Sequence, residues 1–353
     1  MRVALVAHET THHRDTASTR RFDRLANQLS DAGHDVTVFT AQWWNRGPQT
    51  LDLQGVGYVG VTHGPALPSF CTRLPFLLAR HRPDVIHARV TPPQQVVAAS
   101  AGGTLARAPL AVEWYGDEGL DPRARLTRWA ASDPQMVITP SELVRTRVRE
   151  LGASGESSRP IPESIDFGRV EASGTAEEVD VVYAHPLDES ANIESLLLGL
   201  AELRDREWTA TVIGDGPKRD DYEREAADLR IDDRVSFVGA CDRERRLNIY
   251  RGAHAFVQTA LREYFPTELL WALACGCVGI VEYQAESSAH ELIEDYERGF
   301  RVTNPQQLAD AILEAGGFER LTADETWRAY DHDAVRERYV ATYEQLVGDF
   351  GFL

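Results

Sequence analysis

Short β-like apolar runs alternate with amphipathic helical patterns along almost the whole chain, and this alternation restricts the fold more than any other feature. Strands interleaved with helices predict a parallel sheet that is covered by helices on both faces. In chain order, the first series of strands and helices is expected at residues 3–7, 19–32, 36–40, 85–87, 94–106, 110–113, 136–139 and 142–151.

A segment rich in Gly, Ser, Pro and Glu, residues 152–178, contains no long apolar run, so we expect a linker there. The alternation then restarts, and 353 residues are too many for one ordinary domain. We therefore predict two doubly wound, Rossmann-like α/β domains, at residues 1–168 and 169–334, with a last helix in 335–353 that packs back on the first. Ligands bind outside the carboxyl ends of such strands, so two sheets that face each other are expected to form a cleft.

The charge is strongly acidic and unevenly distributed. The net charge is −18, and Lys218 is the only lysine. Residues 1–170 hold 19 arginines and 17 acidic residues, whereas the remainder holds 18 basic and 38 acidic residues. Such a surface is typical of a halophilic protein, because concentrated salt screens its self-repulsion. Duplex nucleic acid is not an expected partner, because the acidic half would repel the phosphate backbone.

Several other classes of protein are excluded by their motifs. The segment after the first strand, HETTHH, has no Gly-x-Gly-x-x-Gly, and GDGPK at residues 214–218 lacks the spacing of a P-loop, which argues against dinucleotide oxidoreductases and NTPases. No run is long enough to span a membrane, and residues 1–10 do not resemble a signal peptide. The four cysteines follow no zinc spacing and are expected to be reduced, so we predict a cytoplasmic protein.

The stretch REYFPTELLWALACG at residues 262–276 places two acids, Glu263 and Glu268, at the start of an apolar helical pattern. Pro266 suits the first turn of a helix. The free amide groups of that turn could meet an anion beside Glu263. For Glu263 the competing interpretation is a helix-start acid that only interacts with the helix dipole.

Over nearly its whole length, the chain resembles the GT-B-fold retaining glycosyltransferases of family 4, which transfer sugars from nucleotide donors. The motifs that carry this resemblance lie in the family's order, at residues 32–38 (AGHDVTV), 83–87 (PDVIH), 162–166 (PESID), 213–217 (IGDGP) and 262–276. The resemblance implies a donor in the C-terminal domain, an acceptor in the N-terminal domain, and no metal or cofactor. It also implies that Glu263 touches the transferred sugar and that Gly214 and Gly216 form the nucleotide loop.

Other positions depart from the family's pattern. The family's second Glu falls on Trp271, its Gly-Arg falls on His185-Pro186, its lysine falls on Ala191, and its His-Gly appears as Tyr115-Gly116. Glu268 lies one helical turn before Trp271, so it is either a replacement ribose contact or a plain surface acid. Trp271 either stacks on a base or packs inward. For the missing phosphate cations we consider Arg262, Lys218, Arg219 and His185.

In the N-terminal half, Glu113, Trp114, Tyr115 and Asp117 form a cluster at a strand end that would suit a sugar acceptor or form a wall of the core. Arginine-rich segments at residues 73–82 and 123–129 also carry apolar side chains and could contact an anionic membrane or a lipid phosphate. His8, His12 and His13 are either metal ligands or, as we expect, part of a solvated loop.

Two functions remain from these patterns. The first is a retaining glycosyltransferase that passes a sugar from a nucleotide diphosphate to a lipid-linked or glycan acceptor. The second is a glycosyltransferase-like chain that no longer catalyses and serves as a sugar-binding or partner subunit. The missing phosphate cations and Trp271 favour the second.

Overall fold

Two compact units make up the protein, whose computed structural model describes residues 1–44 and 49–350. The first unit is Met1–Glu163 together with the C-terminal segment from Asp333, and the second is Ser164–His332. The two boundaries therefore lie at residues 163/164 and 332/333, near the predicted ends at 168 and 334. Residues 351–353 of the predicted last helix lie outside the described part of the chain.

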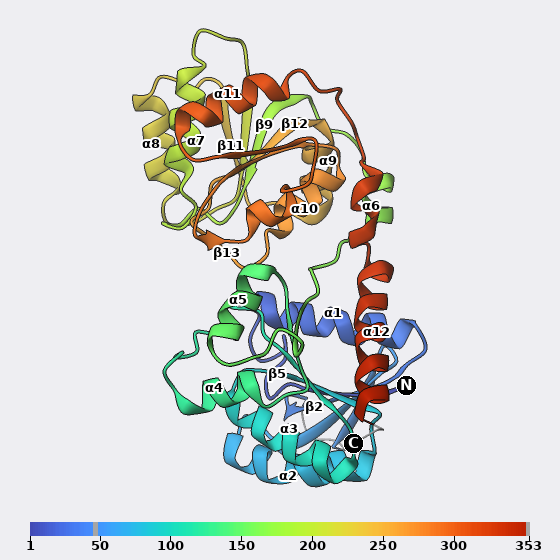
Figure 1. The fold of residues 1–353 in the computed structure, drawn as a ribbon. Helices are drawn as coiled ribbons and strands as arrows, with labels where there is room; N and C mark the ends of the chain where they lie inside the picture. Colours follow the sequence, from blue (N-terminus) through green and yellow to red (C-terminus); the bar gives the residue numbers. More distant parts are fainter. Residues whose placement is uncertain (45–48, 351–353) are drawn as a thin grey trace. The chain divides into compact units, whose positions relative to one another are not determined.

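The first unit is built on an eight-stranded sheet with the order β3-β4-β2-β1-β5-β6-β7-β8 (Figure 1). Its strands pair in parallel except for the antiparallel pair of β3 and β4. The strands are β1 (Arg2–Val6), β2 (Asp35–Gln42), β3 (Thr50–Leu53), β4 (Val56–His63), β5 (Val85–Arg89), β6 (Leu110–Glu113), β7 (Met136–Thr139) and β8 (Ser158–Pro160).

Six helices belong to this unit among the residues the structure describes. They are α1 (Ala17–Asp31), α2 (Leu67–His81), α3 (Pro93–Ala106), α4 (Arg125–Ser132), α5 (Glu142–Glu150) and α12 (His332–Phe350). Local sequence explains where α1 begins, because Thr16 and Thr19 bond reciprocally to each other's backbone amide groups. The helix ends at Ala32-Gly33, where Gly33 takes a positive φ of 82°.

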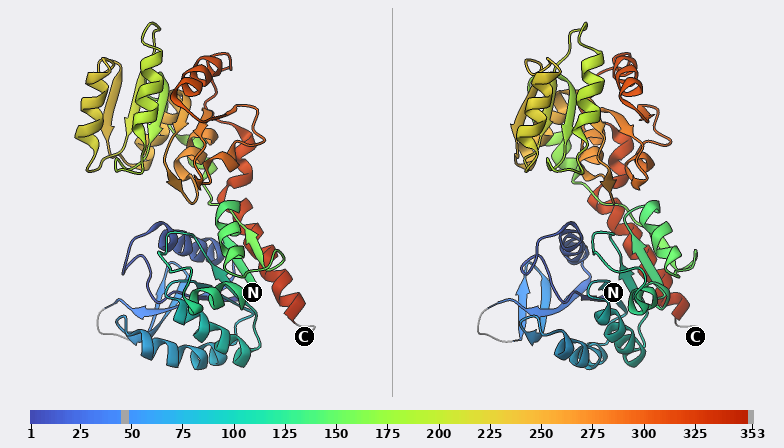
Figure 2. Two further views of the ribbon diagram at one scale, coloured as in Figure 1. Left: turned by 60° about the vertical axis from the view of Figure 1, so that its left-hand side comes forward. Right: turned by 90° about the vertical axis from the view of Figure 1, so that its left-hand side faces the viewer.

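The C-terminal helix α12 packs on the first unit (Figure 2). Val335, Tyr339, Tyr343 and Leu346 join the hydrophobic core that contains β1 and α1. From β8, Arg159 donates hydrogen bonds to Thr342 at 2.9 Å and to Gln345 at 2.8 Å. Two aromatic rings one helical turn apart thus hold the helix against the sheet.

The second unit contains a six-stranded, all-parallel sheet with the order β11-β10-β9-β12-β14-β16, and a separate two-stranded pair, β13 and β15. Its main strands are β9 (Val179–Ala184), β10 (Ala210–Ile213), β11 (Val235–Gly239), β12 (Ala253–Gln258), β14 (Val278–Glu282) and β16 (Gly299–Val302). The small pair joins β13 (Arg262–Glu263) to β15 (Glu286–Ser287).

Helices cover both faces of this sheet, as the alternation predicts. Along β9, Val181 and Tyr183 enter one hydrophobic core, whereas Val182 and Ala184 enter the other. The α-helices are α6 (Phe167–Ala172), α7 (Ile193–Glu202), α8 (Arg219–Asp228), α9 (Arg243–Gly252), α10 (Thr267–Ala274) and α11 (Pro305–Ala315), and 3₁₀ turns lie at Ala289–Leu292 and Glu325–Tyr330.

Several details differ from the sequence-based expectation. The segment 152–178 is not a plain linker, because it contains β8 and α6, and its side chains Ile165, Phe167 and Val170 are buried. Pro266 is the N-cap of α10 and not part of its first turn. The strands β3, β4 and β16 were not predicted, because β3 and β16 are short and partly exposed and because Gly57 and Gly60 interrupt the apolar pattern of β4.

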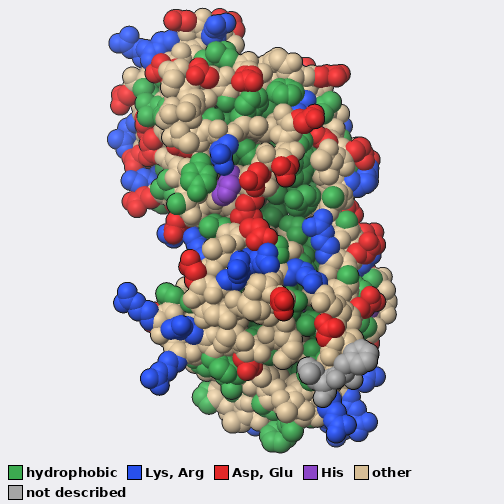
Figure 3. Space-filling view, in the orientation of Figure 1, with side chains coloured by type: hydrophobic (Ala, Val, Ile, Leu, Met, Phe, Trp, Pro, Cys, Tyr) green, Lys and Arg blue, Asp and Glu red, His purple; other side chains and the backbone are tan. Residues whose placement is uncertain are grey.

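Charged side chains are distributed unevenly between the two units. On the face drawn in Figure 3, Asp and Glu side chains (red) are numerous over the second unit, whereas Lys and Arg (blue) stand out over the first. Among the described residues, no helix is both long and apolar enough to cross a membrane.

Candidate donor-binding site

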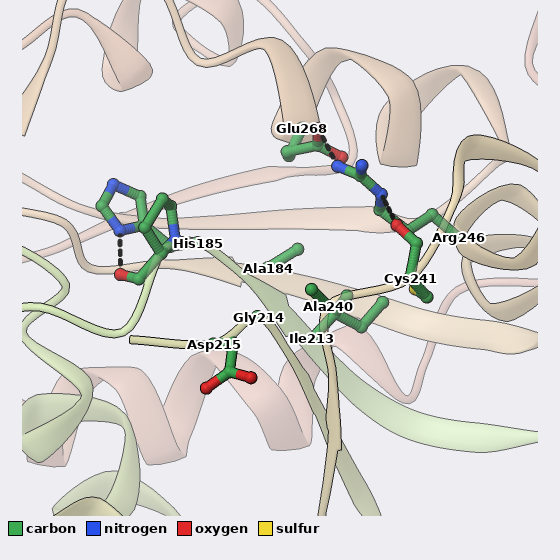
Figure 4. A pocket seen from close by; sticks show the side chains of 10 residues that line it. Ala184, His185, Ile213, Gly214, Asp215, Ala240, Cys241, Arg246 and Glu268 are labelled. Atoms are coloured by element: carbon green, nitrogen blue, oxygen red, sulfur yellow. Dashed lines mark hydrogen bonds and ion pairs between the residues drawn. The ribbon is translucent and has the colours of Figure 1, made fainter. Parts of the chain in front are cut away.

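A pocket of about 300 Å³ opens in the second unit at the carboxyl ends of β9 and β10 (Figure 4). In this sheet β10 and β11 lie on one side of β9 and β12 lies on the other, so the strand order reverses there. Such a reversal is where open α/β sheets bind ligands. The lining residues are Ala184, His185, Pro186, Ile213, Gly214, Asp215, Ala240, Cys241, Arg246 and Glu268.

The glycine loop after β10 packs directly against the loop after β9. A Cβ atom on Gly214 would lie 2.0 Å from the carbonyl oxygen of His185, and one on Gly216 would lie 2.4 Å from that of Leu187. Gly214 also has a φ of 143°, which other residues rarely adopt. Both glycines are therefore required for the close approach of the two loops, and Gly214 lines the pocket directly.

His185 connects the pocket to Glu263. Its Nε2 atom lies 3.4 Å from Oε1 of Glu263, and its Nδ1 atom lies 2.8 Å from the carbonyl oxygen of Pro186. Burial lowers the pKa of His185, but the hydrogen bond and negative charge of Glu263 outweigh it, so the pKa is raised. Gln258, from the end of β12, also donates to Glu263 at 3.4 Å. The structure thus brings the two predicted site residues together.

Glu268 takes part in an arginine cluster. Arg246 Nη1 donates to Glu268 Oε1 at 2.7 Å, and Arg243 Nη1 donates to Oε2 at 3.0 Å. The hydroxyl of Tyr250 donates to Oε2 at 2.7 Å. Glu268 is therefore neither a plain surface acid nor a free carboxylate, because three donors from α9 already bind it.

Trp271 packs inward, which was one of its two predicted roles. Its side chain is 6% exposed and belongs to a hydrophobic core of the second unit. The guanidinium of Arg243 lies over the indole ring, 4.9 Å from its centre. The ring does not line the pocket.

The candidate cations fall into two groups. His185 lines the pocket, whereas Lys218, Arg219 and Arg262 do not. Lys218 pairs with Asp221 at 3.3 Å, Arg219 with Glu223 at 2.8 Å, and Arg262 with Glu286 at 3.2 Å.

Arg246 also lines the pocket, and it was not among the cations predicted from the sequence. The run DRERR at residues 242–246 is the signal that could have identified it, because it follows a strand at the start of a helix. Asp242 caps this helix by accepting a hydrogen bond from the backbone of Arg245.

In the first unit, Glu113 is an interior residue. It is 2% exposed, lies 2.7 Å from Arg21 Nε and 3.2 Å from the hydroxyl of Tyr339. Trp114 and Tyr115 are also buried, with exposures of 6% and 5%. Of the two interpretations for this cluster, the structure shows these three side chains as parts of the core.

Asp117 is exposed in the loop after β6. Its carboxylate accepts a hydrogen bond from the backbone of Ser18 at 3.3 Å. Glu118, which sequence analysis passed over, accepts from the backbone amide groups of Tyr115 and Gly116 at 2.6 and 2.7 Å. Burial and the charge of Asp117 raise the pKa of Glu118 to about 7.

The histidines near the first strand do not converge. The ring of His12 stacks on Trp43 with centres 3.6 Å apart, and Nδ1 of His13 accepts from the backbone of Thr10 at 3.2 Å. Within the described ranges, no group of three or more His, Cys, Asp or Glu side chains could hold a metal ion.

Comparison with protein families matches each unit to a separate model. Residues 170–316 match "Glycosyl transferases group 1", and residues 16–163 match "Glycosyl transferase 4-like domain". The chain carries two glycosyltransferase domains. The pocket lies within the group 1 domain, and Glu113 and Glu118 lie within the 4-like domain.

A curated relative and several solved structures resemble this glycosyltransferase chain. Alpha-monoglucosyldiacylglycerol synthase of Streptococcus pneumoniae is 27% identical over 207 residues, which is 54% of this chain and 46% of the relative. The match therefore spans about half of that protein.

The solved structures show the GT-B fold. A glycosyltransferase from Rickettsia africae has a TM-score of 0.76 at 14% identity, with 98% of each chain covered. Anabaena HepE in complex with UDP has a TM-score of 0.73 at 17% identity, with 98% of this chain and 100% of HepE covered. The two Rossmann-like α/β domains, together with these GT-B neighbours, confirm the predicted fold class.

Proposed function

We propose that this chain transfers a sugar from a nucleoside-diphosphate sugar to an acceptor, with retention of configuration. The observation that carries the proposal is the pocket of the second unit, where a glycine loop, His185 and Arg246 meet at the strand reversal. HepE, which shares the fold, has been solved with UDP and with UDP-glucose, which supports a nucleotide sugar as donor.

In this proposal Glu263 faces the donor sugar and His185 is a cation near the diphosphate. A leaving diphosphate accumulates negative charge, so it needs fixed donors nearby. His185 has acceptor oxygens at both ring nitrogens, which favours the doubly protonated, cationic ring. The arginine of the family's pattern, which falls on Pro186 in this chain, would thereby be partly replaced by His185.

For the acceptor we propose a lipid-linked or glycan molecule, with a diacylglycerol lipid or a glycolipid as the first candidates. The matched relative is a monoglucosyldiacylglycerol synthase, and α2 and α3 expose Phe76 (70%), Leu105 (56%) and Val97 (41%). Arg73 and Arg80 lie on α2 as well. Apolar and basic side chains together suit peripheral contact with an anionic membrane, such as the cytoplasmic face of a cell membrane.

Binding and turnover together test the proposal. A thermal-shift screen in concentrated salt against UDP, GDP, ADP, dTDP and their sugars should show one stabilising nucleotide, because a ligand at 100 times its Kd adds about 2.7 kcal/mol. The stabilising donor is then incubated with vesicles that contain diacylglycerol or a monoglycosyl lipid. A shift without any transfer or donor hydrolysis would favour the alternative of a non-catalytic sugar-binding or partner subunit, which the family departures at His185, Ala191 and Trp271 support.

A further inference from the structure

Arg246 has the geometry of a preorganised binding group. Its Nε donates to the carbonyl oxygen of Cys241 at 3.1 Å and its Nη1 donates to Glu268 at 2.7 Å (Figure 4). Within the described part of the chain, Nη2 makes no hydrogen bond, and the residue lines the pocket. The two bonds, from Nε and from Nη1, fix the orientation of the planar guanidinium and leave the remaining Nη1 and Nη2 donors for a ligand.

The guanidinium of Arg246 brings positive charge to a pocket wall that also contains acidic side chains. Its lining includes the carboxylates of Asp215 and Glu268, and among the described lining residues Arg246 is the one Lys or Arg. Glu268 is neutralised because Arg243 and Arg246 both pair with it, at 3.0 and 2.7 Å. An anion that approaches Glu268 therefore meets a carboxylate that is already paired with two arginines, and not an unpaired acid.

The same contacts oppose a direct role for Glu268 in binding sugar hydroxyl groups. Its Oε2 accepts from both Arg243 and Tyr250, and its Oε1 accepts from Arg246. A carboxylate with three donors at these distances would have to give up charge-assisted hydrogen bonds before it could accept from a ribose. The position of Glu268 instead suits a residue that fixes the orientation of the Arg246 guanidinium.

We propose that Arg246 binds the phosphate groups of the nucleotide and that Glu268 is a positioning residue for Arg246. This inference rests on the proposed function and deepens it, because it adds a phosphate cation on α9 to His185 at the end of β9. A guanidinium fork that is already in place binds phosphate oxygens without further loss of side-chain freedom.

The test compares Arg246→Gln with Arg245→Gln. Arg245 lies on the same helix, is exposed and does not line the pocket, so its removal is a matched control for charge. Calorimetry measures the Kd of UDP, GDP, ADP and dTDP and of their nucleosides, the last by competition. Arg246→Gln should weaken the diphosphate that the wild type binds by roughly tenfold or more and leave its nucleoside unchanged, because a hydrogen bond to a charged group is lost.

Glu268→Gln separates positioning from direct binding. If the only effect were the removal of a negative charge, anion binding would become tighter. Release of Arg246 should instead weaken binding of the diphosphate and leave binding of the nucleoside unchanged. An equal loss for nucleoside and diphosphate would show that Glu268 binds the ribose, and unchanged or tighter diphosphate binding would also contradict the positioning role.

Two further outcomes keep this inference separate from the proposed function. If the wild type binds none of the four diphosphates, the proposed function fails. If it binds one and Arg246→Gln binds equally well, only the assignment of Arg246 fails. Circular dichroism checks each variant, and Arg246→Lys replaces Arg246→Gln if that variant does not fold, with an expected loss that is smaller but still confined to the diphosphate.

Discussion

Nε2 of His185 lies 3.4 Å from Oε1 of Glu263, so the end of β9 is joined to the segment before α10 by an ion pair. Because Nδ1 of the same ring faces the carbonyl oxygen of Pro186, both ring nitrogens are surrounded by acceptors. The pair places a cation at the edge of the pocket without using a lysine or an arginine. Its strength depends on pH.

The first prediction concerns that pH dependence. The folded protein raises the pKa of His185, so the ion pair stabilises the fold fully below the ordinary pKa of about 6.5, and this stabilisation is lost as the pH rises through the higher folded pKa. Urea unfolding of the wild type and His185→Asn between about pH 6 and 9 should show a difference that is largest at low pH. A difference that grows with pH would contradict the assignment.

Glu263→Gln should abolish sugar transfer and leave the fold intact. The substitution removes the charge that faces His185 but keeps the size of a side chain that is 22% exposed. Transfer is measured with the donor from the nucleotide screen, and Glu286→Gln is the control, because Glu286 is an exposed acid in the neighbouring strand β15. Full activity of Glu263→Gln would exclude a catalytic role for this residue.

Glu113→Ala should destabilise the first unit and not change donor binding. It would leave Arg21 buried without its partner at 2.7 Å, and such a loss costs about 3–5 kcal/mol. Burial would raise the pKa of Glu113, but Arg21 and His87 hold it below the ordinary value, so the stabilisation is present at neutral pH and lost as acid protonates the carboxylate. Unfolding measured at about pH 7 and at about pH 3, below the ordinary pKa of a glutamate, checks both statements, and an unchanged stability would disprove the structural role.

Nucleotide should protect Cys241 from alkylation. Cys241 lines the pocket and is partly exposed, whereas Cys275 and Cys277 are buried. Cys71 provides an internal control, because it is partly exposed on α2 of the other unit. Mass spectrometry after limited iodoacetamide treatment should show slower labelling of Cys241 alone, and equal protection of Cys71 would indicate a global effect.

Gly214→Ala should disrupt the pocket. The new Cβ would lie 2.0 Å from the backbone oxygen of His185, so the loops after β9 and β10 must separate. We expect the nucleotide-induced thermal shift to disappear. Gly348→Ala is the matched control, because a Cβ there meets nothing within 4 Å and alanine favours a helix by roughly 0.5–1 kcal/mol. A normal shift in Gly214→Ala would mean that the ligand lies elsewhere.

The alternation of apolar runs is a local property, and it was sufficient to predict two doubly wound units and most elements of both sheets. β7 has the predicted bounds, Met136–Thr139, because a short apolar run of this kind is buried in a parallel sheet. The short motif at residues 262–276 likewise placed Glu263 just before the start of α10, because a motif of consecutive residues can be identified without knowledge of tertiary contacts.

The roles of charged and aromatic side chains depended on contacts between segments that are distant in the chain. Glu113 became an interior residue only because α1 supplies Arg21 and α12 supplies Tyr339, and Trp271 turned inward beneath Arg243. In the same way, Arg246 lines the pocket only because α9 lies beside the start of α10, where Glu268 binds it. Local sequence determines which segments fold into strands and helices, but the partners of a buried charge are chosen by packing, because burial without a partner costs too much free energy.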